Sequence, residues 1–103
     1  MVRFLVVYET PADPAAFDRH YRDVHIPLVR ALPGLRRFTI SRNAAAVRGG
    51  DPFHLVAELE WDSLQDLQDA FASPQGRATS ADVANLAPDG AVRSMVFELD
   101  DVL

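Results

Sequence analysis

Apolar and polar residues are arranged so that strands are predicted at both ends of the chain. Residues 2–9 alternate, placing Val2, Phe4, Val6 and Tyr8 on one face and Leu5 and Val7 on the other. A strand with apolar residues on both faces is expected to be covered on both sides. Residues 91–99 follow the turn sequence Pro88-Asp89-Gly90 and are predicted to form the last strand.

A helix is predicted to begin at Pro14, with Asp13 as its N-cap. Its apolar stripe is expected to contain Phe17, Tyr21, Val24, Leu28 and Ala31. Pro33-Gly34 should end it. Pro27 lies inside this helix and cannot donate a backbone hydrogen bond, so we expect a kink or break near His25-Ile26, with the helix resuming from Pro27.

The middle of the chain predicts two strands and a second helical region. Residues 35–43 and 53–61 alternate like strands, and the glycine-containing segment 44–52 between them should be a loop. Ser63 is expected to cap a helix, and Ser73-Pro74 to start a second helical segment. The resulting order, strand-helix-strand-strand-helix-strand, is the ferredoxin-like βαββαβ pattern of the α+β class, with a four-stranded antiparallel sheet. At this length, residues 1–103 are expected to form a single domain.

Both helical regions should cover one face of that sheet, which leaves the apolar residues of the other face without a partner. Soluble monomers rarely expose a continuous apolar patch of several hundred Å². We therefore predict a homodimer in which two sheets pack face to face and form an α+β barrel with the helices outside.

Composition narrows the choice of partners and chemistry. The net charge is −5, which argues against nucleic acid and anionic membranes as partners. No apolar run reaches the roughly 18 residues that span a bilayer. Cysteine is absent, which excludes thiolate catalysis and fits a cytoplasmic location. All ten basic residues are arginine, so a lysine Schiff base is also excluded.

The predicted first helix carries the residues best suited to catalysis. His25 lies at the margin of the buried stripe, one turn after Tyr21 and beside the expected break. It is either a partly buried histidine with a structural hydrogen bond or a general acid/base in a pocket between helix and sheet. Tyr21 could hold the imidazole tautomer or donate to a developing oxyanion. His20, on the other edge of the stripe, is interpreted first as a half-exposed packing residue.

A metal site is not expected. His54 should point to the strand face opposite Trp61, and His20 and His25 are separated by about 140° on an ideal helix, a poor chelating pair. We therefore predict neither a metal nor another cofactor. No phosphate loop, dinucleotide fingerprint or nucleophile elbow is present.

The first helix resembles the signature of the EthD family, named after a protein of an ethyl tert-butyl ether degradation cluster. The matching residues are Phe17-x-x-His20-Tyr21-x-x-x-His25-x-Pro27-Leu28 followed by Leu32-Pro33-Gly34-Leu35, with weaker agreement at Trp61, Phe71-x-Ser73-Pro74 and Asp82. The resemblance implies the dimeric α+β barrel superfamily. Relatives on that barrel include muconolactone isomerases, cofactor-free monooxygenases, polyketide cyclases and haem-degrading enzymes. Methylmuconolactone methylisomerase is similar at His25 but has a tyrosine where this chain has Phe38.

Three hypotheses follow. The first is a homodimeric enzyme, of isomerase, cyclase or cofactor-free monooxygenase type, acting on a hydrophobic cyclic or aromatic carbonyl compound. His25 and Tyr21 would be catalytic. The substrate would be bound by Phe17, His20, Phe38, Trp61 and Phe71. The second is a non-catalytic protein that binds a small molecule in the same pocket, as a carrier or an accessory to an oxygenase. The third is haem binding through a histidine. Fold alone does not choose among them.

Overall fold

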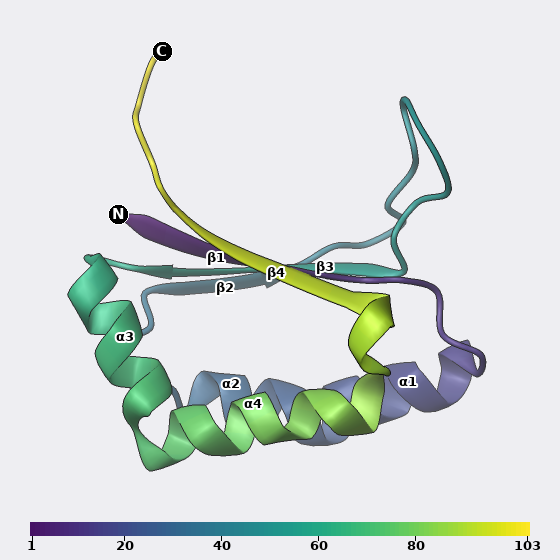
Figure 1. Cartoon of the computed structure of the whole chain (residues 1–103), viewed down its shortest axis with the longest axis horizontal. Coiled ribbons are helices and arrows are strands. Elements are labelled where there is room, and N and C mark those ends of the chain that lie inside the picture. Colours follow the sequence, from purple (N-terminus) through teal and green to yellow (C-terminus); the bar gives the residue numbers. More distant parts are fainter.

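The computed structural model describes residues 1–103 and contains one four-stranded sheet with all its helices on one side (Figure 1). The strands are β1 (Val2–Tyr8), β2 (Arg37–Ile40), β3 (Leu55–Trp61) and β4 (Val92–Glu98). They lie in the order β2-β3-β1-β4, and every neighbouring pair is antiparallel. The predicted α+β class and ferredoxin-like βαββαβ order are confirmed.

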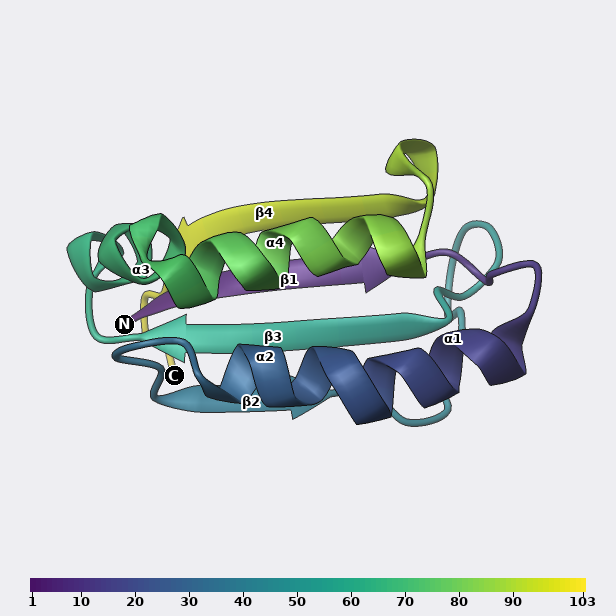
Figure 2. The same ribbon diagram turned by 90° about the horizontal axis from the view of Figure 1, so that it is seen from below.

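Two groups of helices cover the sheet (Figure 2). The first helical layer consists of α1 (Pro14–His20), the π-helical turn η1 (Tyr21–His25) and α2 (Ile26–Arg30), and it lies over β2 and β3. The second helical layer consists of α3 (Leu64–Ala72) and α4 (Pro74–Leu86), with α4 over β1 and β4. A short 3₁₀ turn, η2 (Asp89–Ala91), leads into β4. None of the helices combines the length and the hydrophobicity that a membrane-spanning helix requires.

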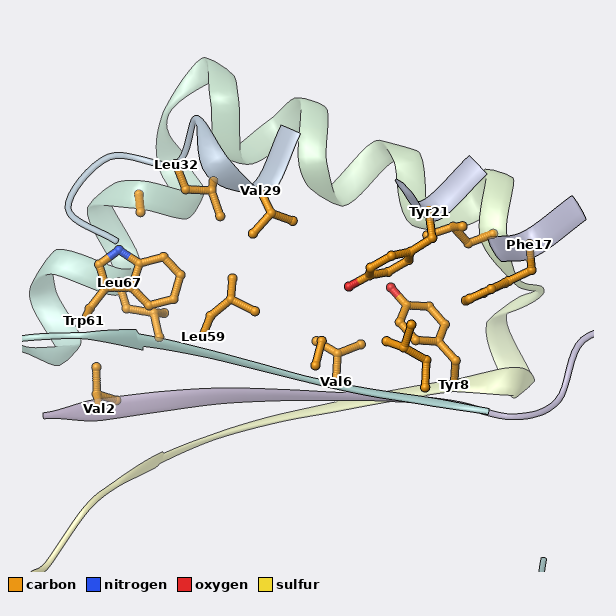
Figure 3. Close-up of a cluster of buried hydrophobic side chains, with 14 residues drawn as sticks. Val2, Val6, Tyr8, Phe17, Tyr21, Val29, Leu32, Leu59, Trp61 and Leu67 are labelled. Carbon is orange, nitrogen blue, oxygen red and sulfur yellow. The ribbon is translucent and has the colours of Figure 1, made fainter. Parts of the chain in front are cut away.

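The core lies between the sheet and these helices (Figure 3). On β1 the even-numbered residues face it, as the alternation predicts, and Val2, Val6 and Tyr8 are buried. Trp61 is fully buried, and its indole N–H donates to the carbonyl of Pro33 at 2.9 Å. Gly34 follows at a φ of +71°, so the turn that ends the first helical layer uses a conformation that favours glycine.

The strands lie where the sequence predicts them, but some of them end earlier or begin later than predicted. The predicted serine caps are both present. β2 and β3 are shorter than the predicted 35–43 and 53–61. Ser63 caps α3 by accepting from the Asp66 amide, and Ser73 caps α4 by accepting from the Gly76 amide, as expected. Pro74 directly follows the second cap, where a missing N–H has no cost.

The prediction for the first helix was wrong in one respect. The helix does not break at His25-Ile26; it widens one turn earlier, at η1, where the Ile26 N–H donates to the Tyr21 carbonyl. Pro27 then falls in the first turn of α2, where its ring and missing N–H are tolerated. The extra residue in the wide turn shifts the buried stripe, which contains Phe17, Tyr21, His25, Val29 and Leu32. Val24 and Ala31, predicted to be buried, are exposed.

The face of the sheet away from the helices is partly apolar. Leu5 and Val7 on β1 and Val56 on β3 are half-buried on this face, and Met95 on β4 is 55% exposed. Arg3 and Glu60 form a hydrogen-bonded ion pair at one end of it. This outer face is the surface for which a partner was predicted.

Candidate functional site

A cavity of about 260 Å³ lies between the inner face of the sheet and the helices. Ten of its fourteen lining residues are hydrophobic, so it favours an apolar ligand. Its lining consists of Phe4, Val6, Tyr8, Tyr21, His25, Val29, Ala57, Leu59, Phe71, Thr79, Ser80, Val83, Val92 and Ser94. Tyr8, Tyr21 and His25 are buried, whereas Ser80 and Ser94 are exposed, so the cavity opens between α4 and β4.

His25 is held in this cavity by a carboxylate from the other helical layer. Its Nδ1 lies 2.9 Å from Oδ2 of Asp82 on α4, and both side chains are nearly completely buried. The π turn makes this contact possible. On a regular α-helix the stripe that starts at Phe17 and Tyr21 would continue through Val24, and His25 would be displaced from it. The extra residue of η1 turns His25 inward instead.

Asp82 is shared by two histidines and an asparagine. Oδ1 lies 2.8 Å from Nε2 of His20 and accepts from the Asn85 side-chain amide at 3.0 Å. Burial alone would raise the pKa of Asp82, but the hydrogen bonds from Asn85, His20 and His25 outweigh it and lower that pKa. The carboxyl group is therefore ionised at neutral pH and can only accept hydrogen bonds.

The ionised carboxylate determines the tautomer of His25. Burial lowers the pKa of His25 below its ordinary value, against the opposing effect of Asp82, so the ring is neutral at neutral pH. Since Asp82 can only accept, the single proton of the neutral ring lies on Nδ1. Nε2 then carries the lone pair, and it makes no hydrogen bond within the protein. A neutral imidazole in this tautomer can accept a proton at Nε2.

Two tyrosines complete the polar part of the cavity. Tyr8 on β1 and Tyr21 on η1 pack edge to face with ring centroids 6.0 Å apart, and Tyr21 lies 5.0 Å from the His25 ring. Their hydroxyl groups both point into the space between helix and sheet (Figure 3). Burial raises the pKa of Tyr8 to about 12 and that of Tyr21 further, so both are neutral donors at neutral pH.

The residues predicted to bind substrate are distributed over several environments. Phe71 lines the cavity with Tyr21 and His25. Phe17 stacks behind Tyr21, with ring centroids 5.8 Å apart, and Trp61 is in the core. Phe38 packs against the core from the edge strand β2. None of these three borders the cavity, and neither does His20.

His54 lies apart from the other two histidines. It precedes β3, and its ring packs edge-on against Phe17 at 5.1 Å while Nε2 contacts Asp18 at 2.8 Å. It therefore faces the first helix, and the prediction that it points to the other strand face was wrong. An ideal helix would separate His20 and His25 by about 140°, but a π turn follows His20 and both rings contact one carboxylate, that of Asp82. No group of three or more histidine, aspartate or glutamate side chains is arranged to hold a metal ion.

Asp82 and Tyr8 were not predicted as site residues. Asp82 is 57 positions from His25 in the chain, so no local spacing connects them. Two signals were available. Asp82 is one of the positions of weaker agreement with the family signature, and it occurs on the buried face of α4 with Thr79 and Leu86, where an acidic residue needs a partner. Tyr8 was assigned to the correct strand face, but alternation does not show what a hydroxyl meets.

Comparisons with known proteins find a family model, a relative and a solved structure that match most of this chain. The family model for the EthD domain matches residues 9–90. An uncharacterised 11.0 kDa protein from the thcB-thcC intergenic region of Rhodococcus erythropolis is 43% identical over 98 residues, which cover 94% of this chain and 92% of that protein. The crystal structure of an ethyl tert-butyl ether degradation family protein from Bacillus halodurans is 34% identical. It covers 97% of this chain and 99% of that chain, with a TM-score of 0.88.

More distant structures share the fold. The cofactor-independent oxygenase SnoaB from Streptomyces nogalater is 19% identical with a TM-score of 0.67, covering 99% of this chain and 95% of that chain. A protein from Thermobifida fusca described as dimeric, ferredoxin-like and of unknown function is 16% identical with a TM-score of 0.69, covering 95% and 90% of the two chains.

Proposed function

The chain belongs to the EthD family, and from that premise we propose that it is a proton-transfer enzyme whose substrate is a hydrophobic cyclic or aromatic carbonyl compound. Residues 1–103 would act as one domain. His25 would take a proton from carbon or oxygen of the substrate, Tyr21 would donate a hydrogen bond to it, and Phe71 would contact its ring.

One observation carries this proposal: the His25 ring borders an apolar cavity while its Nδ1 is bound to an ionised, buried carboxylate. A structural histidine needs a partner for its polar atoms, and Asp82 provides one for Nδ1 only. Nε2 is left with a lone pair that no protein donor uses. A neutral imidazole whose orientation is fixed by a carboxylate is the arrangement that general bases use in hydrolases.

The size and lining of the cavity support the class of substrate. An apolar cavity of about 150 Å³ is enough to bind benzene, so about 260 Å³ accommodates one or two fused rings. No acidic or basic side chain except His25 lines it, so a strongly charged ligand has no counter-ion there. Isomerisation, cyclisation and cofactor-free oxygenation of such compounds can all begin with removal of a proton. SnoaB, which shares this fold, is a cofactor-independent oxygenase.

The same proposal includes a homodimer formed through the outer face of the sheet. Leu5, Val7, Val56 and Met95 provide an apolar surface there that no helix covers. Proteins of this fold such as the one from Thermobifida fusca are described as dimeric. Pairing two such faces would bury these residues and leave both cavities, which lie on the inner faces, open at their own mouths.

Hydrogen exchange in a simple ketone tests the proton transfer directly. In D₂O, 2-tetralone exchanges the protons next to its carbonyl, and NMR follows their loss. The wild-type protein is expected to accelerate this exchange, and His25→Gln to lose at least about 100-fold of the acceleration, the lower range of general-base effects. Asp82→Asn should lose about tenfold or more, because an asparagine no longer requires the proton on Nδ1.

His54→Gln is the matched control, since His54 lies outside the cavity and is expected to leave the rate unchanged. Equal exchange rates in wild type and His25→Gln would refute the assignment of the base. Saturable binding of 2-tetralone with no acceleration in the wild type would instead support the non-catalytic binding protein.

A further inference from the structure

The cavity contains two hydrogen-bond donors that the protein itself does not use. Tyr8 and Tyr21 are 1% and 2% exposed, yet neither hydroxyl is bonded to any protein group. No fully enclosed side-chain nitrogen or oxygen lacks a partner. Both hydroxyls must therefore border accessible space, and the space that both residues line is the cavity.

The two hydroxyls converge from different layers of the fold. Tyr8 comes from the end of β1 and Tyr21 from the π turn; their rings meet at 80°, and both oxygens end in the space between helix and sheet (Figure 3). Phe17 packs against both rings, at 5.3 Å from Tyr8 and 5.8 Å from Tyr21, and holds them from behind. Donors whose rings are locked by packing are preorganised to meet one acceptor.

We propose that Tyr8 and Tyr21 together form an oxyanion-binding pair, so that the ligand of this cavity is a ring compound that bears a carbonyl or phenol oxygen. This inference rests on the proposed function for the role of His25, and it adds Tyr8 as a second residue that touches the substrate. His25 takes the proton from a carbon next to the carbonyl. The electron pair of that C–H bond forms the enolate double bond, and the charge collects on the oxygen that both tyrosines face.

The electrostatics of the site are consistent with donors rather than acceptors. Burial raises the pKa of both phenols, so they keep their protons at neutral pH. The negative charge on Asp82 also raises the pKa of Tyr8, so the carboxylate lies close enough to interact electrostatically with this phenol. The other hydroxyls of the cavity are poorer candidates. Thr79 is buried, but its hydroxyl already donates to the Gln75 carbonyl at 2.9 Å, and Ser80 and Ser94 lie at the solvent-exposed mouth.

The experiment uses 2-naphthol, a bicyclic phenol whose ionised form mimics an enolate and fluoresces differently from the neutral form. The wild-type protein should bind it and lower its pKa, because two donors stabilise the anion. Tyr8→Phe and Tyr21→Phe keep the rings and their packing and remove one hydroxyl each. Each is expected to weaken binding of the naphtholate about tenfold or more, the usual effect of a hydrogen bond to a charged group, and to weaken binding of naphthalene less than about twofold.

His54→Gln is the control, since His54 lies outside the cavity and bonds to Asp18; it should bind naphtholate as the wild type does. Wild-type affinity for naphtholate in both phenylalanine variants would overturn the oxyanion pair. An equal loss of naphtholate and naphthalene binding would also overturn it, because that result means a change of shape. The proposed base fails separately, if His25→Gln exchanges 2-tetralone at the wild-type rate while naphtholate binding still depends on the tyrosines.

Discussion

At the scale of single residues, the central feature is a carboxylate that fixes the state of a buried histidine. Asp82 accepts hydrogen bonds from three side chains and stays ionised, and His25 consequently keeps its proton on Nδ1. The arrangement has a thermodynamic consequence, because the pKa of each group differs between the folded and unfolded chain.

The stability of the protein should decrease on mild acidification. Burial lowers the pKa of His25, so between its ordinary value of about 6.5 and the lower folded value the unfolded chain binds more protons. The contribution of neutral His25 to the free energy of unfolding is therefore fully present above about pH 6.5 and is lost as the pH falls through that window. Urea unfolding at about pH 7.5 and about pH 5.5 measures this loss.

His25→Gln should reduce the loss, because glutamine does not titrate, whereas His54→Gln should keep it. The lowered pKa of Asp82 also makes the protein less stable in acid, but at lower pH. Its contribution to the free energy of unfolding is present above the ordinary aspartate pKa of about 3.9 and is lost as the pH falls below that value. An unfolding free energy that is equal at about pH 7.5 and about pH 5.5 in the wild type would contradict the environment described for His25.

At the scale of elements, the corner between α3 and α4 is closely packed. Ser73 ends α3 and caps α4, and Gly76 lies directly against the preceding helix. A Cβ on Gly76 would come within 2.2 Å of the Ala70 carbonyl oxygen and 2.5 Å of the Phe71 Cα. Backbone atoms at these distances cannot move away without shifting a helix.

Gly76→Ala is therefore expected to destabilise the protein by about 1–3 kcal/mol or more, although alanine is the better helix former. Gly90→Ala is the control, since a Cβ there meets nothing within 4 Å. Thermal unfolding of the two variants measures the difference. Equal unfolding temperatures would mean that α3 and α4 are less closely packed than described.

The π turn is the element that the sequence could not predict. Periodicity identified the helix, its N-cap and its end, but a regular period of 3.6 residues cannot include an inserted residue. The prediction therefore followed the true stripe through Phe17 and Tyr21 and then departed from it at Val24. Pro27 gave the only warning, and it was interpreted as a break. For this reason His25 was placed at the margin of the buried stripe rather than inside it.

Removing one residue from the π turn should restore a regular helix. The buried residues Phe17, Tyr21, His25, Val29 and Leu32 have spacings of four, four, four and three. Deleting the exposed Val24 changes the second spacing to three, which is the α-helical repeat of four, three, four and three. Pro27→Ala is combined with the deletion because proline in a regular helix interior costs about 3 kcal/mol.

This double variant is expected to fold and to unfold cooperatively, with a free energy within about 2 kcal/mol of Pro27→Ala alone. Deleting Ala81 from the regular helix α4 in the same background is the control. It rotates Asp82 and Leu86 away from the core, so loss of more than about 4 kcal/mol or of the cooperative transition is expected. Equal damage by both deletions would contradict the interpretation of η1 as a one-residue insertion.

At the scale of the whole molecule, the two faces of the sheet have different roles. The inner face carries the cavity, and its alternation could be predicted from β1 and β3 alone. The grouping of Tyr8, His25 and Asp82 could not be predicted, because the three residues come from separate elements: Tyr8 and His25 line the cavity, and Asp82 binds His25. Their proximity follows from the packing of η1 and α2 against α4 and from the core that the helices and the sheet share. The outer face provides the argument for a second copy of the chain.

Val7→Arg tests that argument, because Val7 lies on the outer face between Val56 and Arg93 in the paired strands. A sheet-to-sheet dimer would bury the new arginine beside an existing one, and an unpaired buried charge costs several kcal/mol. The monomer, by contrast, can extend this side chain into water. Sedimentation at micromolar concentration should give about twice 11.4 kDa for the wild type and 11.4 kDa for the variant. Val24→Arg, on the exposed side of the helical layer, makes the same change away from the sheet and should remain dimeric. A monomeric wild type would contradict the proposed homodimer. A dimeric Val7→Arg variant would mean that the dimer interface lies on another surface.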